Sequence, residues 1–341
     1  IKAIWAVNEK TALEQALGSS MVGRRTLVAM KHVGLNVAAD PFMNAAIVDI
    51  NGGCVIAVAD DPGMHSSQNE QDSRYFADFG RVPCFEPTNQ QEAYEMTREA
   101  FELSERFHVP VLLRLVTRLA HSRAVVETRE GLEQRPLNKS TNPQGWTLLP
   151  SNARRQWHEL LKSQKELNEY CESSTFNPLT INDNNKDLGV ITCGLARNYY
   201  MECIEDLGPE LPSHLHIGAY PFPAEKVREM GKHVKKILIF EEGYPFVERY
   251  IRGVFPPEVQ ILGKESGELP LEGELNPELA RKAVGLDPLP AGAELSEDVA
   301  LPGRPPQLCA GCPHGDTYKA LNNVVASVTQ ALVTSDIGCY T

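Results

Sequence analysis

The chain has 341 residues, 42% of them hydrophobic and 23% charged, and a formal net charge of −12. This length accommodates two or three globular domains. The negative charge, without a dense Lys/Arg block, argues against binding to nucleic acid or an anionic membrane. No apolar run approaches the roughly 20 residues of a membrane helix. Eight cysteines are too dispersed for a disulfide framework. We therefore expect a cytoplasmic protein, and the abrupt start and stop predict a segment of a longer polypeptide.

Residues 1–127 predict a first α/β domain that lacks its N-terminal flank. Apolar runs predict buried strands, and apolar residues at helical spacing predict the helices between them. The expected strands are Thr26–Met30, Cys54–Ala59 and Val109–Val116, and the expected helices are Pro41–Ile50 and Asn89–His108. Strands that alternate with helices indicate a doubly wound parallel sheet, whose ligands bind at the carboxyl ends of the strands.

Polar segments follow all three of these strands. They cover Lys31–Asn36, Asp60–Asp72 and Thr117–Ser122. Each segment taken alone is most simply a solvated loop rich in turn residues. Because the carboxyl ends of neighbouring parallel strands meet at one edge, three such segments together favour a binding face.

The middle of the chain predicts a linker and a second α/β domain. Residues 128–186 form a linker with a helical insertion, whose charged helix is expected at Arg154–Cys171. Residues 187–268 predict a second parallel sheet, with Glu241-Glu242-Gly243 as the polar group at one strand end. The strands of this second domain are expected at Leu188–Cys193, His214–Ile217, Lys236–Phe240 and Val259–Leu262, and one helix at Leu195–Leu207. The Pro- and Gly-rich composition of residues 269–306 predicts a connecting arm.

Residues 307–341 predict the start of a third domain. Cys309 and Cys312 lie in a Cys-x-x-Cys turn, a helix is expected at Asp316–Val328 and a strand at Ala331–Val333, and the chain then reaches Cys339. Three thiols returned to one place are suited to an iron–sulfur cluster or zinc. A redox dithiol, half of a zinc site, two buried cysteines and a phosphate cradle at the helix N-terminus remain open readings of the same turn.

Several stretches in this order resemble the large subunit of indolepyruvate ferredoxin oxidoreductase, in the 2-oxoacid:ferredoxin oxidoreductase superfamily. The resemblance covers nearly the whole chain and implies a thiamine-diphosphate-binding fold: a pyrimidine-binding domain, a transketolase C-terminal-like domain and the start of a diphosphate-binding domain. The stretches are Asn8–Glu14, Met30–Pro41, Asp60–Pro62, His65–Asp72, His121-Ser122, Glu241–Gly243, Gly273–Leu275, Cys309–His314 and Asp336–Tyr340.

The resemblance implies the cofactors thiamine diphosphate, Mg²⁺ and a [4Fe–4S] cluster. By position, Glu9 is the carboxyl group that hydrogen-bonds the pyrimidine N1′ and promotes ylide formation; on residue pattern alone it is an acidic residue at a helix start. Cys309, Cys312 and Cys339 are the implied cluster ligands, with the fourth beyond Thr341. Lys31, Asn36, His314, Asp336 and Gly338 are further cofactor-binding candidates. Asp336 is not assigned to magnesium, because the metal-binding Gly-Asp motif of the family lies further downstream.

The implied reaction is oxidative decarboxylation of an arylpyruvate, such as indolepyruvate, to an aryl-acyl-CoA. Electrons pass through iron–sulfur clusters to ferredoxin, and a small partner subunit completes a hetero-oligomer. We expect His65 and Asn69 to handle substrate or protons. The usual ferredoxin-like cysteine tail of the family is absent from this sequence. Two alternatives stay open: a non-oxidative thiamine-dependent decarboxylase or ligase, and a non-catalytic, metal-stapled subunit of a larger complex.

Overall fold

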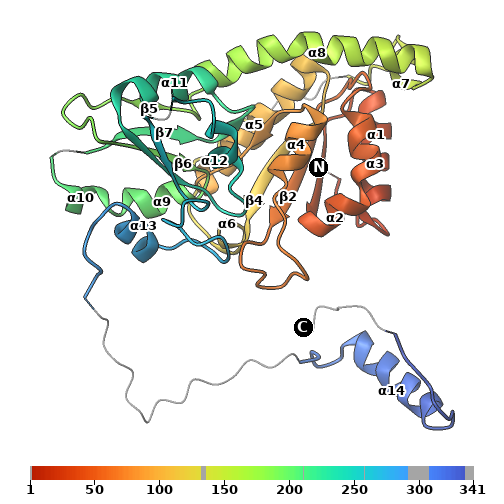
Figure 1. The fold of residues 1–341 in the computed structure, drawn as a ribbon. Helices are drawn as coiled ribbons and strands as arrows, with labels where there is room; N and C mark the ends of the chain where they lie inside the picture. The colour runs from red at the N-terminus through yellow and green to blue at the C-terminus, as the bar shows by residue number, and fades with distance from the viewer. Residues whose placement is uncertain (1, 132–135, 210, 257, 291–306, 335–341) are drawn as a thin grey trace, which may run out of the picture. The chain divides into compact units, whose positions relative to one another are not determined.

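The computed structural model describes residues 2–131, 136–209, 211–256, 258–290 and 307–334. The chain divides into two compact units, Ile1–Pro288 and Leu289–Thr341 (Figure 1). None of the described helices is both long enough and apolar enough to cross a membrane. The two described sheets both lie in the first unit, and the candidate site is built on them.

The first sheet has the strand order β1-β2-β4-β3-β8. Strands β1 to β4 run parallel, and β8, which comes from the second half of the unit, pairs antiparallel with β3. Figure 1 shows α1, α2 and α3 grouped on one side of this sheet. The strands are β1 (Thr26–Lys31), β2 (Cys54–Asp60), β3 (Cys84–Phe85), β4 (Val111–Val116) and β8 (Ala219–Tyr220), and the helices are α1 (Glu9–Met21), α2 (His32–Val37), α3 (Ala39–Ala45), α4 (Arg74–Gly80), α5 (Gln90–Phe107) and α6 (Thr117–His121).

The second sheet has the order β10-β9-β6-β7-β5, with only β5 antiparallel. The long helix α8 runs past α7 and α11 along one side of the unit (Figure 1). The strands are β5 (Leu179–Thr180), β6 (Leu188–Cys193), β7 (Ser213–Ile217), β9 (Lys236–Phe240) and β10 (Gln260–Leu262), and the helices are α7 (Pro143–Trp146), α8 (Pro150–Ser173), α9 (Ala196–Met201), α10 (Ile204–Leu207), α11 (Ala224–His233), α12 (Phe246–Ile251) and α13 (Pro277–Ala283).

The doubly wound parallel architecture predicted from the sequence is confirmed, with local differences. The segment predicted as a polar loop after β1 is largely helical, as α2. The helix expected to reach Ile50 ends at Ala45, and the one expected over 195–207 is split into α9 and α10. Strands β3 and β8 are two residues long, and so short an element leaves no period-2 pattern in the sequence.

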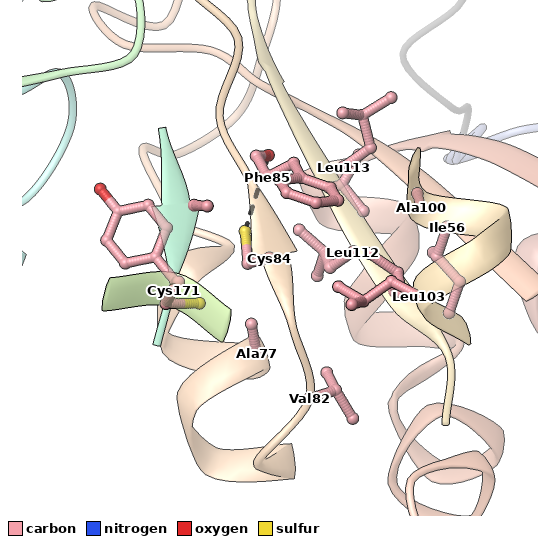
Figure 2. Close-up of a cluster of buried hydrophobic side chains, with 14 of the residues drawn as sticks. Ile56, Ala77, Val82, Cys84, Phe85, Ala100, Leu103, Leu112, Leu113 and Cys171 are labelled. Atoms are coloured by element: carbon pink, nitrogen blue, oxygen red, sulfur yellow. Dashed lines mark hydrogen bonds between the residues drawn. The ribbon is translucent and has the colours of Figure 1, made fainter. Parts of the chain in front are cut away.

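The apolar core of the first sheet continues into the helical insertion. Figure 2 shows β3 at its centre, where Cys84 and Phe85 contact side chains from neighbouring strands and helices. Cys171 of α8 belongs to the same cluster and is 1% exposed. The remaining labelled side chains are Ile56, Ala77, Val82, Ala100, Leu103, Leu112 and Leu113. Because one core includes residues from both sheets and from α8, the first unit packs as one body, and the boundaries at residues 127 and 187 stay a prediction.

The prediction of a connecting arm at residues 269–306 is wrong for the first part of that range. Leu269, Leu275 and Ala280 are buried in the core of the second sheet, and Pro277–Ala283 forms α13. Asn276 caps this helix by accepting a hydrogen bond from the backbone N–H of Leu279 at 2.9 Å. Although the composition of this segment is typical of a linker, its buried apolar residues hold it against the second sheet. Residues 291–306 of the predicted arm lie outside the described part of the chain.

The second unit contains α14 (Pro313–Val325), close to the helix predicted there. Residues 331–334 form no regular structure, so the strand expected at Ala331–Val333 is not found. A strand is held by hydrogen bonds to a neighbouring strand, and within the described part of this unit no other strand is present to supply them. None of the described side chains of α14 is buried.

Two buried arginines join the two sheets. Arg114 in β4 donates to Asp60 Oδ2 at 2.6 Å, to Glu86, and to the carbonyl oxygen of Glu242 at 3.1 Å. The Arg114 side chain is 0% exposed, as is that of Asp60. Removing the cation would leave carboxylates buried without a partner, which costs about 3–5 kcal/mol. The second sheet is therefore bound to the first through charges as well as apolar contacts.

Arg74, at the start of α4, makes an equivalent set of contacts. It donates to Glu241 Oε2 at 2.9 Å and to the carbonyl oxygen of Tyr244 at 3.0 Å. Its Nε atom lies 2.9 Å from Asp72 Oδ1. Burial alone raises the pKa of Asp72, but the neighbouring guanidinium groups outweigh burial and hold that pKa below its ordinary value. We name the set Asp60, Asp72, Arg74, Glu86, Arg114, Glu241 and Glu242 the buried ionic cluster.

We predict that Arg114→Met destabilises the protein by about 3–5 kcal/mol, because Asp60 loses its cation and Glu86 one of its two cations in a buried site. Urea denaturation followed by circular dichroism measures this change. The control is Arg129→Met, since Arg129 pairs with Glu95 at 3.3 Å on the surface and is 68% exposed. Its loss is worth no more than about 1 kcal/mol. Equal effects of the two substitutions would contradict a structural role for the buried ionic cluster.

Candidate functional site at the carboxyl ends of the first sheet

Asp61 is the hub of the candidate site. It follows β2, and its carboxylate accepts hydrogen bonds from Thr117 Oγ1 at 2.6 Å and from Ser67 Oγ at 2.6 Å. Lys31 Nζ, at the end of β1, lies 3.8 Å from Asp61 Oδ2. The three polar segments that follow β1, β2 and β4 are therefore brought together at one edge, as the sequence predicted.

The Asp61 carboxylate is held in its charged form. Burial raises its pKa, but the hydroxyl groups of Ser67 and Thr117 and the backbone N–H groups of Ser66 and His65 donate to it and lower the pKa well below the usual range. Lys31 adds hydrogen bonds to the carbonyl and hydroxyl oxygens of Ser66 at 3.0 and 3.1 Å. One ionised carboxylate thus organises the turn that carries His65.

A buried histidine fixes the far end of the same loop. The ring nitrogens of His32, at the first position of α2, lie 3.3 Å from the carbonyl oxygen of Ala59 and 3.1 Å from that of Asn69. His32 is 1% exposed. The backbone of Asn69 is therefore anchored, while its exposed side chain accepts a hydrogen bond from Gln71 at 2.8 Å.

Glu9 lies against the backbone of α2. A Cβ atom on Gly34 would lie 2.5 Å from Cγ and 2.8 Å from Oε1 of Glu9, so a side chain at position 34 would force the Glu9 side chain out of this place. Glu9 is half-buried at the first position of α1, directly after the N-cap residue Asn8, whose side chain accepts from the N–H of Thr11 at 2.9 Å. The sequence singled out Glu9, and the structure places its carboxylate beside the segment that begins at Lys31.

The second half of the unit reaches this edge through the segment 273–275. Glu274 Oε2 lies 2.8 Å from Arg118 Nη2 and 3.0 Å from His65 Nε2. Residue pattern alone did not identify Arg118 or Glu274 as site residues, although both lie inside or next to segments that it singled out. Sequence spacing could not reveal this contact, because 156 residues separate Arg118 from Glu274.

The carboxyl group of Glu242, which lies next to this segment, has a pKa that is raised into the neutral range. Burial raises its pKa to about 7, against the opposing effect of the Leu275 backbone N–H, which lies 3.3 Å from both carboxylate oxygens. Lys264 is also buried, but it donates to the carbonyl oxygen of Gly243 at 2.6 Å. Glu242 is thus a buried group that titrates near neutral pH.

The other predicted site residues are not gathered in the same place. Asn36 is exposed on α2 and makes no contact with Asp61 or Glu274 among the described interactions. His314 belongs to the second unit, where its Nδ1 lies 3.6 Å from Cys312 Sγ. Asp336, Gly338 and Cys339 lie outside the described residues.

The Cys-x-x-Cys turn forms as the sequence predicts. The N–H of Cys312 donates to the carbonyl oxygen of Cys309 at 3.0 Å, and Gly311 has a φ of +74° that other residues rarely adopt. Both thiols are free, and Cys309 is exposed. Within the described ranges, no group of three His, Cys, Asp or Glu residues is arranged to hold a metal ion. The turn therefore carries two free thiols three positions apart.

Comparisons with known proteins relate the first part of the chain to a thiamine-diphosphate-binding family. Residues 1–159 match the family described as "Pyruvate flavodoxin/ferredoxin oxidoreductase, thiamine diP-bdg". The chain is similar in fold to 2-oxoglutarate:ferredoxin oxidoreductase from Magnetococcus marinus, solved with 2-oxoglutarate, coenzyme A and succinyl-CoA bound; the TM-score is 0.59 at 15% identity, over 77% of this chain and 54% of that one. At this identity the likeness concerns the fold alone.

Three relatives that are similar in sequence share one name. Indolepyruvate oxidoreductase subunit IorA of Archaeoglobus fulgidus is 38% identical to this chain over 99% of its length and 55% of the relative. The subunits of the same name from Methanothermobacter thermautotrophicus and Pyrococcus abyssi are 39% and 36% identical, over 99% of this chain and 56% and 54% of the relatives. The chain is therefore similar over nearly its whole length to indolepyruvate oxidoreductase subunits, and it spans about half the length of the curated relatives it matches.

We predict that Glu242→Gln removes a pH dependence of stability. The folded protein keeps a proton on Glu242 that the unfolded chain, with an ordinary pKa near 4.5, releases, so stability falls as pH rises from about 4.5 to about 7. Between pH 5 and pH 8 the loss amounts to about 3 kcal/mol relative to the variant. Urea denaturation at both pH values measures it. Glu159→Gln, at an exposed position of α8, is the control, and the same difference at pH 5 and pH 8 would refute the assignment.

Proposed function

We propose that the full-length protein catalyses thiamine-diphosphate-dependent oxidative decarboxylation of an arylpyruvate, such as indolepyruvate, to an aryl-acyl-CoA, with electrons passed through iron–sulfur clusters to ferredoxin. The observation that carries the proposal is the packing of the Glu9 carboxyl group against Gly34 of α2, the helix that directly follows Lys31. The name shared by the relatives, indolepyruvate oxidoreductase subunit, supports the substrate class.

The residues around Glu9 fit the pyrimidine half of thiamine diphosphate. A carboxyl group is required there to hydrogen-bond the ring nitrogen N1′, and the missing Cβ of Gly34 lets Glu9 lie close to the backbone of α2. When bound, thiamine diphosphate supplies the electron sink for decarboxylation. Glu9 would hold or give up a proton at N1′. Lys31, the last residue of β1, and Asn36, on α2, are the further residues that we assign to the cofactor on this side.

His65 and Asn69 are the proposed residues for handling the substrate or a proton. Both side chains are exposed on the loop that Asp61 and His32 anchor at its two ends. A loop fixed through its backbone can present such side chains in a constant orientation.

The second unit would bind the electron-transfer and diphosphate groups. Cys309 and Cys312 present two thiolates from one tight turn, a donor set suited to a [4Fe–4S] cluster, and we assign Cys339 as the third ligand. His314, Asp336 and Gly338 are the proposed contacts for the diphosphate, whose Mg²⁺ ligands we expect beyond Thr341. A small partner subunit, ferredoxin, the 2-oxoacid and coenzyme A complete the proposed assembly.

A second candidate, a non-oxidative thiamine-dependent decarboxylase or ligase, uses the same first domain. It requires Glu9 but no iron. Two free cysteines in the Cys309 turn, one exposed and one half-buried, favour the oxidative reaction, since the alternative assigns this pair no role. Iron analysis and electron paramagnetic resonance of the full-length complex separate the two, because an iron-free, active enzyme would leave only the alternative.

We predict that Glu9→Gln in the full-length complex lowers kcat by about 100-fold or more, because an amide cannot exchange the proton at N1′ as a carboxyl group does. Steady-state assays with indolepyruvate measure the change. Glu14→Gln is the matched control, since Glu14 lies on the same helix, in a weak exposed pair with Lys10 at 3.9 Å. Unimpaired turnover of Glu9→Gln would show that Glu9 has another role.

We predict that Cys309→Ser lowers the iron content of the full-length complex, because a hydroxyl group is a poorer ligand for iron–sulfur clusters than a thiolate. Iron and sulfide analysis measures the loss. Cys203→Ser is the control, because Cys203 is buried in the second sheet's core and burial raises its pKa, so it is not available as a ligand. Full iron content in Cys309→Ser would exclude the turn as a cluster site.

A further inference from the structure

The segment Gly273-Glu274-Leu275 is part of the family resemblance, yet the proposed reaction assigns it no role. It belongs to the second half of the first unit, beyond β10. Leu275 is 1% exposed in the core of the second sheet, and its N–H lies 3.3 Å from both carboxylate oxygens of Glu242. Glu242 itself directly follows Glu241, which binds Arg74. The segment is thus attached to the buried ionic cluster.

The same segment lies against the loop that carries His65. A Cβ atom on Gly63 would lie 3.4 Å from the backbone nitrogen of Glu274 and 3.6 Å from Cα of Gly273. Gly63 also has a φ of +80°, which favours glycine. The two backbones therefore approach each other closely just before His65.

The Glu274 carboxylate joins two side chains of the site. Its Oε2 accepts a hydrogen bond from Arg118 at 2.8 Å and lies 3.0 Å from His65 Nε2. Its side chain is 13% exposed, whereas those of His65 and Arg118 are 53% and 43% exposed. A shielded carboxylate thus contacts two more exposed side chains of the site, the Arg118 guanidinium and the His65 imidazole.

Arg118 is restrained from a second direction. Its guanidinium lies 5.4 Å from the ring centroid of Tyr199, a 4%-exposed residue of α9. A guanidinium stacked on an aromatic ring and bound to a carboxylate loses little further freedom when it contacts an anion. Arg118 follows β4, whose carboxyl end is part of the candidate site.

We propose that Glu274 is a positioning residue, which holds Arg118 and the His65 loop in the orientation that binds the carboxylate of the 2-oxoacid. This inference rests on the proposed function, because it assigns the anionic group of the same substrate to Arg118. It also makes the second α/β half part of the site. Without Glu274, Arg118 loses the carboxylate that holds it over the Tyr199 ring, and His65 loses its side-chain contact with the second half of the unit. The loop then keeps other contacts with that half, such as the hydrogen bond from Tyr244 to the carbonyl oxygen of Glu70 at 3.0 Å.

The test compares Glu274→Ala and Glu274→Gln with Glu272→Ala in the full-length protein with its partner subunit. Glu272 is the matched control, an exposed glutamate two residues away on the same segment. Hydrogen exchange of residues 61–72 without substrate is expected to be about tenfold faster in Glu274→Ala, because a charge-assisted hydrogen bond and an ion pair are lost. Glu274→Gln, which keeps the shape of the side chain, is expected to be intermediate.

Steady-state kinetics supply the second readout. KM for the 2-oxoacid is expected to rise about tenfold in Glu274→Ala with kcat nearly unchanged, since an interaction that holds the bound substrate weakens binding without entering the chemical step. The effects of Arg118→Gln and Glu274→Ala are expected to be non-additive, because the two residues act through one contact.

The inference is overturned if exchange of residues 61–72 is unchanged in Glu274→Ala, or changes equally in Glu272→Ala. Faster exchange with an unchanged KM also overturns it, because Glu274 would then have a structural role only. The exchange measurement needs no turnover, so a wild-type complex that is inactive toward 2-oxoacids contradicts the proposed function and is distinguished from a failure of Glu274 to hold the loop.

Discussion

The buried ionic cluster is the constraint on which the first unit depends. Two arginines without contact to solvent are surrounded by carboxylates from both sheets, and their guanidinium groups also bind backbone carbonyl oxygens of residues 242 and 244. Ion pairs in such a place stabilise a fold only when their geometry is nearly complete, because desolvation costs each ion several kcal/mol. The two α/β halves therefore cannot shift against each other without leaving a charge unpaired.

This constraint has a direct consequence for the candidate site. Asp60 belongs to the buried ionic cluster, and its neighbour Asp61 is the hub that joins the ends of β1, β2 and β4. On the opposite side, Glu241 binds Arg74, while Glu242 reaches the N–H of Leu275 beside Glu274. The two pairs of adjacent acidic residues therefore have the same arrangement. Asp60 and Glu241 bind the arginines that join the sheets, whereas Asp61 and Glu242 bind groups of the candidate site.

Much of the fold could be predicted from the sequence because long apolar runs leave a clear pattern. The strands at residues 54–60 and 111–116, and the helix at 90–107, lie within a few residues of their predicted bounds. The short elements β3, β8 and α4 left no such pattern. One signal in the sequence did point to the buried ionic cluster: Arg114 interrupts an otherwise apolar strand, and a charge in that position requires a buried partner.

The sequence by itself determined the doubly wound architecture, the gathering of polar segments at one sheet edge and the Cys-x-x-Cys turn, because each is encoded in local pattern. A matched motif also made Glu9 a candidate cofactor-binding residue. Only the tertiary structure decided which side chains meet there. Arg74 with Glu241, and Arg118 with Glu274, are more than 150 residues apart, and their contacts exist because two separate sheets pack together. Pairings of this kind depend on packing at long range, which spacing along a chain does not record.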